Sequence, residues 1–515
     1  MKIIHSKITG SCYNFNFLFK MVLSYVALAS LLHVGTGQLL HGSLTSHMVL
    51  QRDTKSKLWG QTSSLSPGDT VSVQLSDDYA NVYETYSGFN GTWEMELNSR
   101  DASNVGLDIK VWTDNETTTI TDVLFGDVYV CSGQSNMKFG LTQDINASTE
   151  CPNTENYPDI RLLWYSANDD PTRADWTRPY TNYTCTDSYV WHSFSAVCWY
   201  FGKDIYESQN GKIPIGLVAS TIGGTPVQAW SSEDALAKCD QTGEKGEHYL
   251  WDQYIEPLLP MVVQGWLWYQ GESNVGGPED YYSCQFPAMI NDWRQKWNQG
   301  NATINNRPKP FLYVILAPYI GQADQGISNI RLEQLETLEK VELTALAAAY
   351  DYGDMFSPPG AIHPRYKGPV GQRLAYAARA IIYGEDIPYL HPTLQSATVK
   401  DSTLTLKFDS PVEIRHGHQG NWSDTLPNAT YEAKLEINGK IASKLTTNSN
   451  GDVEVEIPSH MIENEISSGY DIAYLLGDWP VPSIYAKGSG MPGLPAKPFS
   501  AKATQTSFEN ILETQ

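Results

Sequence analysis

The chain has 515 residues, with 35 Lys and Arg against 58 Asp and Glu, and a formal net charge of −23 at pH 7. This excess of negative charge argues against a large nucleic-acid-binding or anionic-membrane surface. With 41% hydrophobic and 18% charged residues, the composition is that of a globular protein of several domains and excludes a largely disordered chain.

The N-terminal 37 residues have the parts of a secretory signal peptide. Lys20 precedes a short apolar run at residues 21–34, and the small residues 35–37 follow it. A basic flank, a short apolar run and a small-residue cleavage site are typical of a signal peptide, and the run is too short to span a bilayer. We therefore expect residues 1–37 to be removed and the protein to be secreted or lysosomal, without a membrane anchor.

The N-glycosylation sequons and the cysteines are consistent with the expected secretion of the protein. Seven N-x-[ST] sequons are candidate glycosylation sites: Asn90, Asn115, Asn146, Asn182, Asn301, Asn421 and Asn428. Six cysteines follow the expected signal peptide, Cys131, Cys151, Cys185, Cys198, Cys239 and Cys284, and the sequence does not choose among their possible pairings. No C-x-x-C pair occurs, and His416 and His418 have no evident third ligand nearby, so we predict no metal site.

Three regions follow the expected signal peptide. Residues 38–122 contain short runs that alternate apolar and polar residues between Gly, Pro, Asn and Asp, which predicts a β-sandwich-like domain. Residues 123–386 alternate apolar, β-branched runs with longer helix-like stretches, which predicts a three-layer α/β/α domain with a parallel sheet. Short strand patterns return over residues 387–515 and predict a second β-rich domain.

Working residues of open α/β sheets gather at the carboxyl ends of the parallel strands. Ser135 lies just beyond a glycine turn that follows the strand pattern DVYVCSG. A serine at a strand-to-helix turn has an exposed hydroxyl, and its N–H can point at a substrate oxygen, although serine is also a common helix N-cap. Cys131 is a rival nucleophile, but its place inside the strand favours burial or a disulfide.

Three further strand ends carry polar or flexible residues. Gly223 and Gly224 follow one strand, and paired glycines let a backbone N–H approach a ligand or simply make a tight turn. The amide of Asn274 follows a very apolar strand, where buried polar groups need partners. His363 lies in a proline-rich loop before the last helix of the α/β region, where a histidine is suited to proton transfer.

This order of serine, glycine pair, amide and late histidine resembles the SGNH (GDSL-like) hydrolases. The motifs GQSNM, IGGTPVQAW, WYQGESN, IHP and GDWPVPSIYAKGSGMPGLPAKPF are similar to those of the sialate O-acetylesterases, the sialic acid 9-O-acetylesterases. The resemblance extends over nearly the whole mature chain, from the motif HMVLQRD at residues 47–53 onward.

The resemblance implies a role for each candidate residue. Ser135 would be the nucleophile and His363 the general base. The N–H groups of Ser135 and Gly224 (or Gly223), with the Asn274 amide, would form the oxyanion hole. The implied reaction removes O-acetyl groups from sialic acids or sialoglycans through an acetyl-serine, with no metal or cofactor.

The sequence does not identify the group that orients His363, and it leaves alternative functions open. Many SGNH enzymes place an aspartate three residues before the histidine, but Gly360 occupies that position here. Asp351, Asp354 or a backbone carbonyl could orient the histidine instead. Arg365 is a candidate for binding a sialate carboxylate. The alternative functions are an acetylesterase for another carbohydrate, such as acetylated xylan, and a non-catalytic glycan-binding homologue.

Overall fold

The computed structural model describes residues 38–165, 175–179, 185, 193–239, 248–277, 281–297, 308–319, 326–415, 435–442, 444–458, 469–477, 479–480, 482–490, 492–503 and 508–509. The expected signal peptide, the histidines at 416 and 418, and the sequons Asn182, Asn301, Asn421 and Asn428 lie outside these residues. Of the other sequons, Asn115 and Asn146 are exposed and Asn90 is half-buried. No helix among the described residues is long and apolar enough to cross a membrane.

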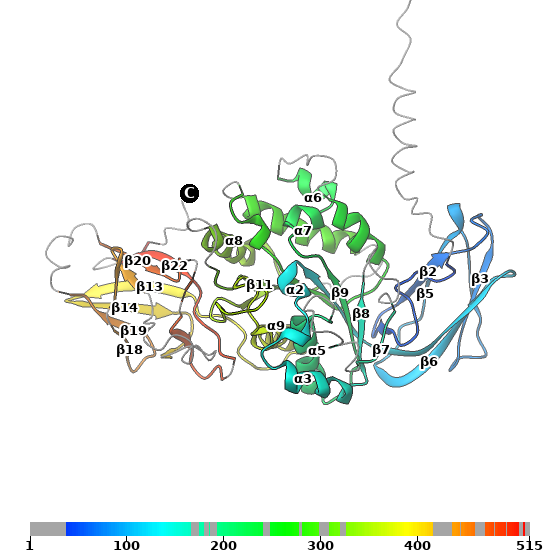
Figure 1. Cartoon of the computed structure of the whole chain (residues 1–515), viewed down its shortest axis with the longest axis horizontal. Helices are drawn as coiled ribbons and strands as arrows, with labels where there is room; N and C mark the ends of the chain where they lie inside the picture. Colours follow the sequence, from blue (N-terminus) through cyan, green and yellow to red (C-terminus); the bar gives the residue numbers. More distant parts are fainter. Residues whose placement is uncertain are drawn as a thin grey trace, which may run out of the picture.

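The N-terminal region is built of short β-strands, as the alternating patterns predict. They are β1 (Val49–Gln51), β2 (Lys57–Gln61), β3 (Thr70–Leu75), β4 (Tyr83–Tyr86), β5 (Thr92–Glu96) and β6 (Ser103–Trp112). Strands β2 and β5 pair with each other, while β4, β3 and β6 form an antiparallel sheet that continues into β7 (Thr117–Gly133). Figure 1 shows these strands at the end of the molecule opposite the C-terminal sheets.

Strand β7 belongs to two regions at once. Its first part pairs antiparallel with β6, and its second part pairs parallel with the strands of the central sheet. Burial along β7 alternates up to residue 122 and is continuous from Val123 to Gly133. The change of sequence pattern at residue 123 therefore marks the point where both faces of one continuous strand become covered.

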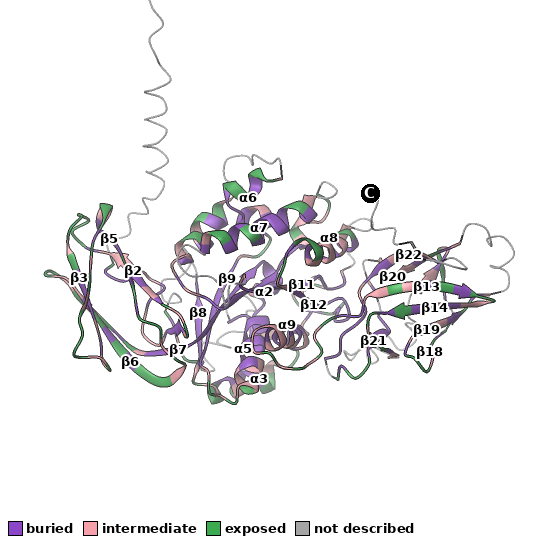
Figure 2. Cartoon of the chain, turned by 180° about the vertical axis from the view of Figure 1, so that it is seen from behind, coloured by how far each residue is buried: buried purple, intermediate pink, exposed green. Residues whose placement is uncertain are grey.

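The central sheet is parallel and has helices on both faces, which confirms the predicted α/β architecture. Its order is β8-β9-β7-β10-β11-β12, with β8 (Ile160–Trp164), β9 (Ile215–Thr221), β10 (Gly265–Tyr269), β11 (Phe311–Ile315) and β12 (Thr344–Ala348). One face carries α3 (Ala147–Asn153), α5 (Ala196–Ser208) and α9 (Lys367–Ile381), and the other carries α6 (Glu233–Ala237), α7 (Tyr281–Trp297) and α8 (Gly326–Lys340) (Figures 1 and 2).

The strand order has a switch point between β7 and β10. After β7 the chain builds β8 and β9 on one side of it, and then crosses to add β10, β11 and β12 on the other side. The loops that leave β7 and β10 at their carboxyl ends therefore diverge, and in doubly wound sheets ligands bind in the crevice at such a point.

The C-terminal region is also β-rich, as predicted. One sheet contains β13 (Leu394–Lys400), β14 (Thr403–Phe408), β18 (Leu445–Thr447) and β19 (Val453–Glu456). A second contains β16 (Leu435–Ile437), β17 (Lys440–Ile441), β20 (Tyr470–Tyr474), β22 (Phe499–Ala503) and β23 (Phe508–Glu509), and β15 (Val412–Ile414) pairs with β21 (Ile484–Ala486).

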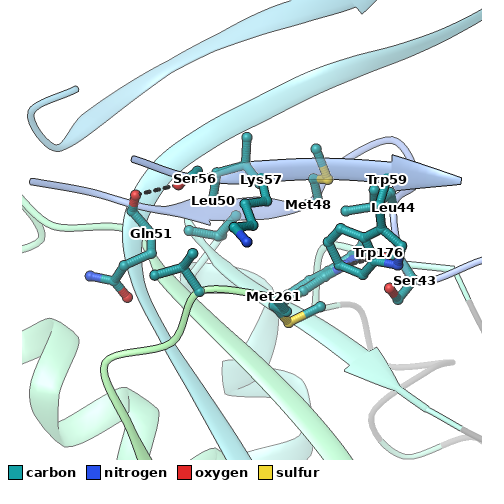
Figure 3. A pocket seen from close by; sticks show the side chains of 12 residues that line it. Ser43, Leu44, Met48, Leu50, Gln51, Ser56, Lys57, Trp59, Trp176 and Met261 are labelled. Atoms are coloured by element: carbon teal, nitrogen blue, oxygen red, sulfur yellow. Dashed lines mark hydrogen bonds between the residues drawn. The ribbon is translucent and has the colours of Figure 1, made fainter. Parts of the chain in front are cut away.

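Hydrogen bonds connect the N-terminal region to the α/β domain. Asp127 in β7 is buried and accepts hydrogen bonds from the Arg52 Nε at 2.9 Å and the Gln51 Nε2 at 3.0 Å, both from the motif HMVLQRD. Trp176 donates its indole N–H to the Ser43 carbonyl at 2.8 Å. Around that contact, side chains of both regions enclose a small pocket (Figure 3).

Three disulfides connect the six cysteines that follow the expected signal peptide: Cys131–Cys198, Cys151–Cys185 and Cys239–Cys284. The first joins β7 to α5 beneath the sheet, so Cys131 is buried and covalently bound. The sequence-based expectation that Cys131 is structural and not a nucleophile is therefore correct.

Candidate active site

The turn that carries Ser135 is shaped by a glycine. At Gly133 the backbone φ is +132°, and a Cβ there would lie 2.2 Å from the Tyr269 carbonyl oxygen of the neighbouring strand. Helix α2 (Ser135–Lys138) begins immediately afterwards, and its first backbone bonds run from Met137 and Lys138 to the Gln134 carbonyl. The Ser135 N–H is therefore one of the free donors at a helix N-terminus, beside a side chain that is 8% exposed.

His363 lies in the loop between β12 and α9 and faces Ser135. Its Nε2 is 2.8 Å from the Ser135 Oγ, and its Nδ1 is 3.0 Å from the Pro359 carbonyl oxygen. Because a carbonyl can only accept, Nδ1 carries the proton and Nε2 accepts from the serine hydroxyl. The two residues are 228 positions apart in the sequence, and the structure brings them into hydrogen-bond contact.

Both carboxylates that the sequence offered as orienting acids are bound by arginines. The two Asp351 oxygens accept from the Arg373 guanidinium at 2.6 Å each. Asp354 accepts from the Arg365 Nε at 2.5 Å and Nη2 at 3.1 Å. The group that the structure brings to the histidine Nδ1 is the third possibility, a backbone carbonyl.

The loop that holds His363 needs a glycine where many SGNH enzymes have aspartate. Gly360 has φ +99°, a conformation that residues with a Cβ rarely adopt. The tight turn is closed by hydrogen bonds from the Gly360 N–H to the Ser357 carbonyl and from the His363 N–H to the Gly360 carbonyl, 2.9 Å each. The Ser357 hydroxyl also donates to the His363 carbonyl. An aspartate at residue 360 would strain this turn.

The surroundings of the His363 imidazole favour its neutral form. Burial lowers the pKa of His363, the hydrogen bond to the Pro359 carbonyl raises it, and the nearby Lys367 charge lowers it further, with a net lowering from 6.5. A neutral imidazole with Nε2 directed at a hydroxyl can accept its proton, so the pair is arranged for general-base activation of Ser135.

Gly223 and Gly224 form the turn after β9 and border Ser135. Both are exposed, and Gly224 has φ +72°. A Cβ on Gly223 would lie 3.5 Å from the Ser135 Cβ, so the turn passes close to the serine. A residue with a Cβ at Gly224 would strain the backbone of this turn, because of its positive φ, whereas the space at Gly223 would admit a Cβ.

Asn274 ends the 3₁₀ turn η9 (Glu272–Asn274), which follows β10. Its Oδ1 accepts from the Val227 N–H at 2.9 Å and from the Gln270 Nε2 at 2.6 Å, so the orientation of the amide is fixed. Its Nδ2 donates to the Gln228 Oε1 at 2.9 Å. Because the Ser273 N–H donates to the Gln134 Oε1 at 3.1 Å, η9 lies against the turn that carries Ser135.

Two residues beside the site were missed by the sequence analysis. Asn136 follows Ser135, and the Lys367 Nζ donates to its Oδ1 at 2.5 Å. Asn136 also donates to the Glu272 Oε1 at 2.5 Å and to the Ile362 carbonyl at 2.9 Å. The only sequence signal for these residues is that each lies within four positions of Ser135 or His363. Among the described residues, no group of His, Cys, Asp or Glu is arranged to hold a metal.

Comparisons with known proteins agree on one family. Residues 125–350 match the profile of the family described as carbohydrate esterase, sialic acid-specific acetylesterase. The sialate O-acetylesterase of Homo sapiens is 35% identical over 395 residues, 68% of this chain and 72% of that protein. The Mus musculus enzyme is 31% identical over 460 residues, 77% of this chain and 84% of that protein.

A solved structure extends the likeness to the flanking β-regions. The crystal structure of a carbohydrate acetylesterase from Xanthomonas citri matches with a TM-score of 0.70 at 25% identity, covering 90% of this chain and 99% of that one. The α/β sheet and both β-rich regions thus lie in the part of the chain that this carbohydrate acetylesterase structure matches. The chain therefore belongs to the sialic acid-specific acetylesterase family of carbohydrate esterases.

Proposed function

We propose that this carboxylic ester hydrolase removes O-acetyl groups from sialic acids through an acetyl-serine intermediate. The observation that carries the proposal is the contact of 2.8 Å between the Ser135 Oγ and the Nε2 of a His363 whose Nδ1 is bonded to the Pro359 carbonyl. Family membership and the named relatives support the acetylated sialic acid or sialoglycan as substrate.

In the first half-reaction, Ser135 attacks the acetyl carbonyl while His363 takes the hydroxyl proton on Nε2. A bond forms between Oγ and the carbonyl carbon, and the carbonyl oxygen becomes an oxyanion. The N–H groups of Ser135 and Gly224, together with the Asn274 Nδ2, are the donors for that charge. The ester bond to the sugar then breaks, and His363 gives its proton to the departing sugar oxygen.

In the second half-reaction, water replaces the sugar. His363 takes a proton from the water as the water oxygen attacks the acetyl-serine carbonyl. The bond to Oγ breaks, acetate leaves, and the proton returns from Nε2 to Ser135. In both halves the Pro359 carbonyl takes over two roles of a triad aspartate: it keeps the Nδ1 proton in place and fixes the ring orientation.

One observation favours a second substrate class. A sialate carboxylate calls for an available cation, and Arg365 was the candidate in the sequence. Its guanidinium is bound by both oxygens of Asp354, so the pair carries no net charge. A neutral acetylated sugar, such as an acetylated xylan fragment, has no carboxylate and so does not need a cation. It is therefore the alternative substrate.

Acetate release tests both candidates together. Wild type and Ser135→Ala are compared on 9-O-acetylated sialic acid and on an acetylated xylo-oligosaccharide. Turnover of the sialic acid that Ser135→Ala abolishes is the expected result. Turnover of the xylan fragment alone would keep the mechanism and replace the substrate. No turnover of either by the wild type would favour a glycan-binding protein on an esterase fold.

We further propose that residues 1–37 are a cleaved signal peptide and that the protein is secreted or lysosomal. Three disulfides support an oxidising compartment, and the exposed sequons Asn115 and Asn146 are accessible for glycosylation. A mature N-terminus near residue 38, together with a mass decrease after enzymatic removal of N-glycans, is the expected result. An unprocessed N-terminus in protein purified from the expressing cells would contradict it.

A further inference from the structure

Lys367 is a buried cation that no step of the proposed reaction uses. It is the first residue of α9 and is 1% exposed. Its Nζ donates to the Asn136 Oδ1 at 2.5 Å and lies 4.7 Å from the centre of the Phe139 ring and 5.3 Å from that of Tyr269. A buried ammonium is costly, and a positive charge in the first turn of a helix opposes the helix dipole. Because Lys367 is unfavourable for stability on both counts, we looked to its contacts for a functional role.

The contacts of Asn136 indicate what that role is. An ammonium group can only donate, so Lys367 requires the oxygen of the Asn136 amide to face it. The amide nitrogen is then directed the other way, where it donates to the Glu272 Oε1 at 2.5 Å and to the Ile362 carbonyl at 2.9 Å. Without Lys367 the amide could rotate by half a turn and lose both bonds.

These bonds connect the three segments that make the site. Asn136 is next to Ser135, Ile362 is next to His363, and Glu272 is in η9, which also contains Asn274. The Lys367 backbone N–H is itself fixed by the Asp144 Oδ2 at 3.0 Å. One amide, oriented by one lysine, thus joins the nucleophile turn, the histidine loop and the candidate oxyanion amide.

We propose that Lys367 is a positioning residue of this esterase: by orienting the Asn136 amide it holds Ser135 and His363 at reacting distance. The inference rests on the proposed Ser135–His363 site. Lys367 contacts neither the Ser135 hydroxyl nor the substrate in this mechanism and acts through Asn136.

The charge of Lys367 adds an effect that a purely structural residue would lack. The ionisable groups around it are Glu272 in η9, Asp144 after the turn that precedes α3, Asp354 in the loop before His363, and the phenol of Tyr269 in β10. Burial lowers the pKa of Lys367 to about 7 against the attraction of those three carboxylates. Where it is charged, Lys367 in turn lowers the pKa of His363, so removing the charge raises that pKa.

The test compares Lys367→Met with a matched variant, Lys309→Met. Lys309 is also buried, its Nζ donates to the Val263 carbonyl, and burial lowers its pKa to about 8. It precedes β11, at the amino end of the sheet and away from Ser135. Both variants remove a buried ammonium, but only the first acts on Asn136. Thermal unfolding of each variant sets a temperature at which it is fully folded for the assays.

For Lys367→Met we expect a fall in kcat on the order of 10²-fold, since a displacement near 1 Å of a reacting group has about that cost. KM should change little, and the acid limb of the pH profile should move to higher pH. Lys309→Met should keep the wild-type kcat and profile. The double variant Lys367→Met, Asn136→Ala should be no slower than Asn136→Ala alone, because the lysine acts through that amide.

The rate of Ser135 labelling by a fluorophosphonate is measured over the same pH range. This reagent reports the activated serine without any sugar, so a wrong substrate assignment would leave the labelling result intact. Unchanged kcat, labelling rate and acid limb in folded Lys367→Met would overturn the proposal. An equal loss in Lys309→Met would also overturn it, because the effect would then follow from losing any buried lysine.

Discussion

Two polar side-chain pairs lie beyond the carboxyl ends of the central strands, and they differ in charge, burial and hydrogen bonding. Beyond β12, Asp351 and Arg373 are both fully buried, oppositely charged and joined by two hydrogen bonds of 2.6 Å. Ser135 after β7 and His363 in the loop after β12 are an uncharged pair joined by one bond of 2.8 Å, with Ser135 buried and His363 half-buried. The first pair has every strong donor occupied, whereas the second keeps a hydroxyl proton that can be transferred.

The partners of each pair show what the difference means. Arg373 also donates to the carbonyls of Gly493 and Pro492, and Tyr485 donates to Asp351, so this pair attaches the C-terminal region to the α/β domain. Ser135 borders the exposed glycine turn, and His363 is bonded to the Pro359 carbonyl. A saturated charge pair gives stability, and an incompletely bonded neutral pair gives reactivity. Each of the following variants tests that division.

The largest expected effect on rate is that of His363→Ala. Without the base, acetate release should fall on the order of 10⁴-fold or more, as for loss of a member of a serine-hydrolase triad. The free energy of unfolding should stay near that of the wild type, because a half-buried loop histidine contributes little packing. Steady-state acetate release and urea unfolding measure the two quantities. Residual activity within tenfold of wild type would exclude His363 as the base.

The second variant breaks the other pair. Asp351→Ala leaves the Arg373 guanidinium buried without its carboxylate, so the free energy of unfolding should fall by about 3–5 kcal/mol. The protein that remains folded should keep its kcat, because Asp351 does not contact His363. Urea unfolding followed by fluorescence, with acetate release measured well below the transition, checks both statements. A folded Asp351→Ala protein without activity would indicate that Asp351 has a catalytic role.

The third variant removes one candidate oxyanion donor. Asn274→Ala should lower kcat on the order of 10²–10³-fold, because the donor acts on charge that exists only in the transition state. KM for the acetyl ester should change much less than kcat. The neighbouring variant Gln228→Ala removes a partner of that amide but no proposed donor, and serves as the control. A rise in KM at constant kcat would instead make Asn274 a ground-state binding group.

The smallest expected effect is on the pH profile of the wild type. His363 must be neutral to act as base, and its folded-state pKa is lowered from 6.5 chiefly by burial. The active neutral form therefore persists below that value, and the acid limb of kcat/KM should lie at a pH below 6.5. A profile of kcat/KM against pH locates the limb. A limb at or above the ordinary histidine value would mean that the imidazole is more exposed to water or paired with a negative charge.

Several expectations followed from local pattern alone. Apolar runs ending at glycine predicted the parallel strands, and polar residues after those ends predicted Ser135, Asn274 and His363 as a group, because parallel strands bring their carboxyl ends to one edge of a sheet. The motif HMVLQRD and the segment at residues 477–499 carried the family resemblance without a physical explanation. In the structure both are contact segments: Arg52 binds the buried Asp127, and the carbonyl of Gly493 binds Arg373.

The sequence by itself determined the types of element and the α/β class, because periodicity and glycine positions are local properties of the chain, and the order of its motifs predicted the set of site residues through the family resemblance. Only the tertiary structure decided the disulfide pairing, the carbonyl that orients His363 and the contact between Lys367 and Asn136. In each case the chain offers several groups that could serve as the partner, and Lys367 and Asn136 are 231 positions apart. Which carboxylate meets which cation is decided by the packing of α9 and the loop before it onto the sheet, and no local pattern encodes it.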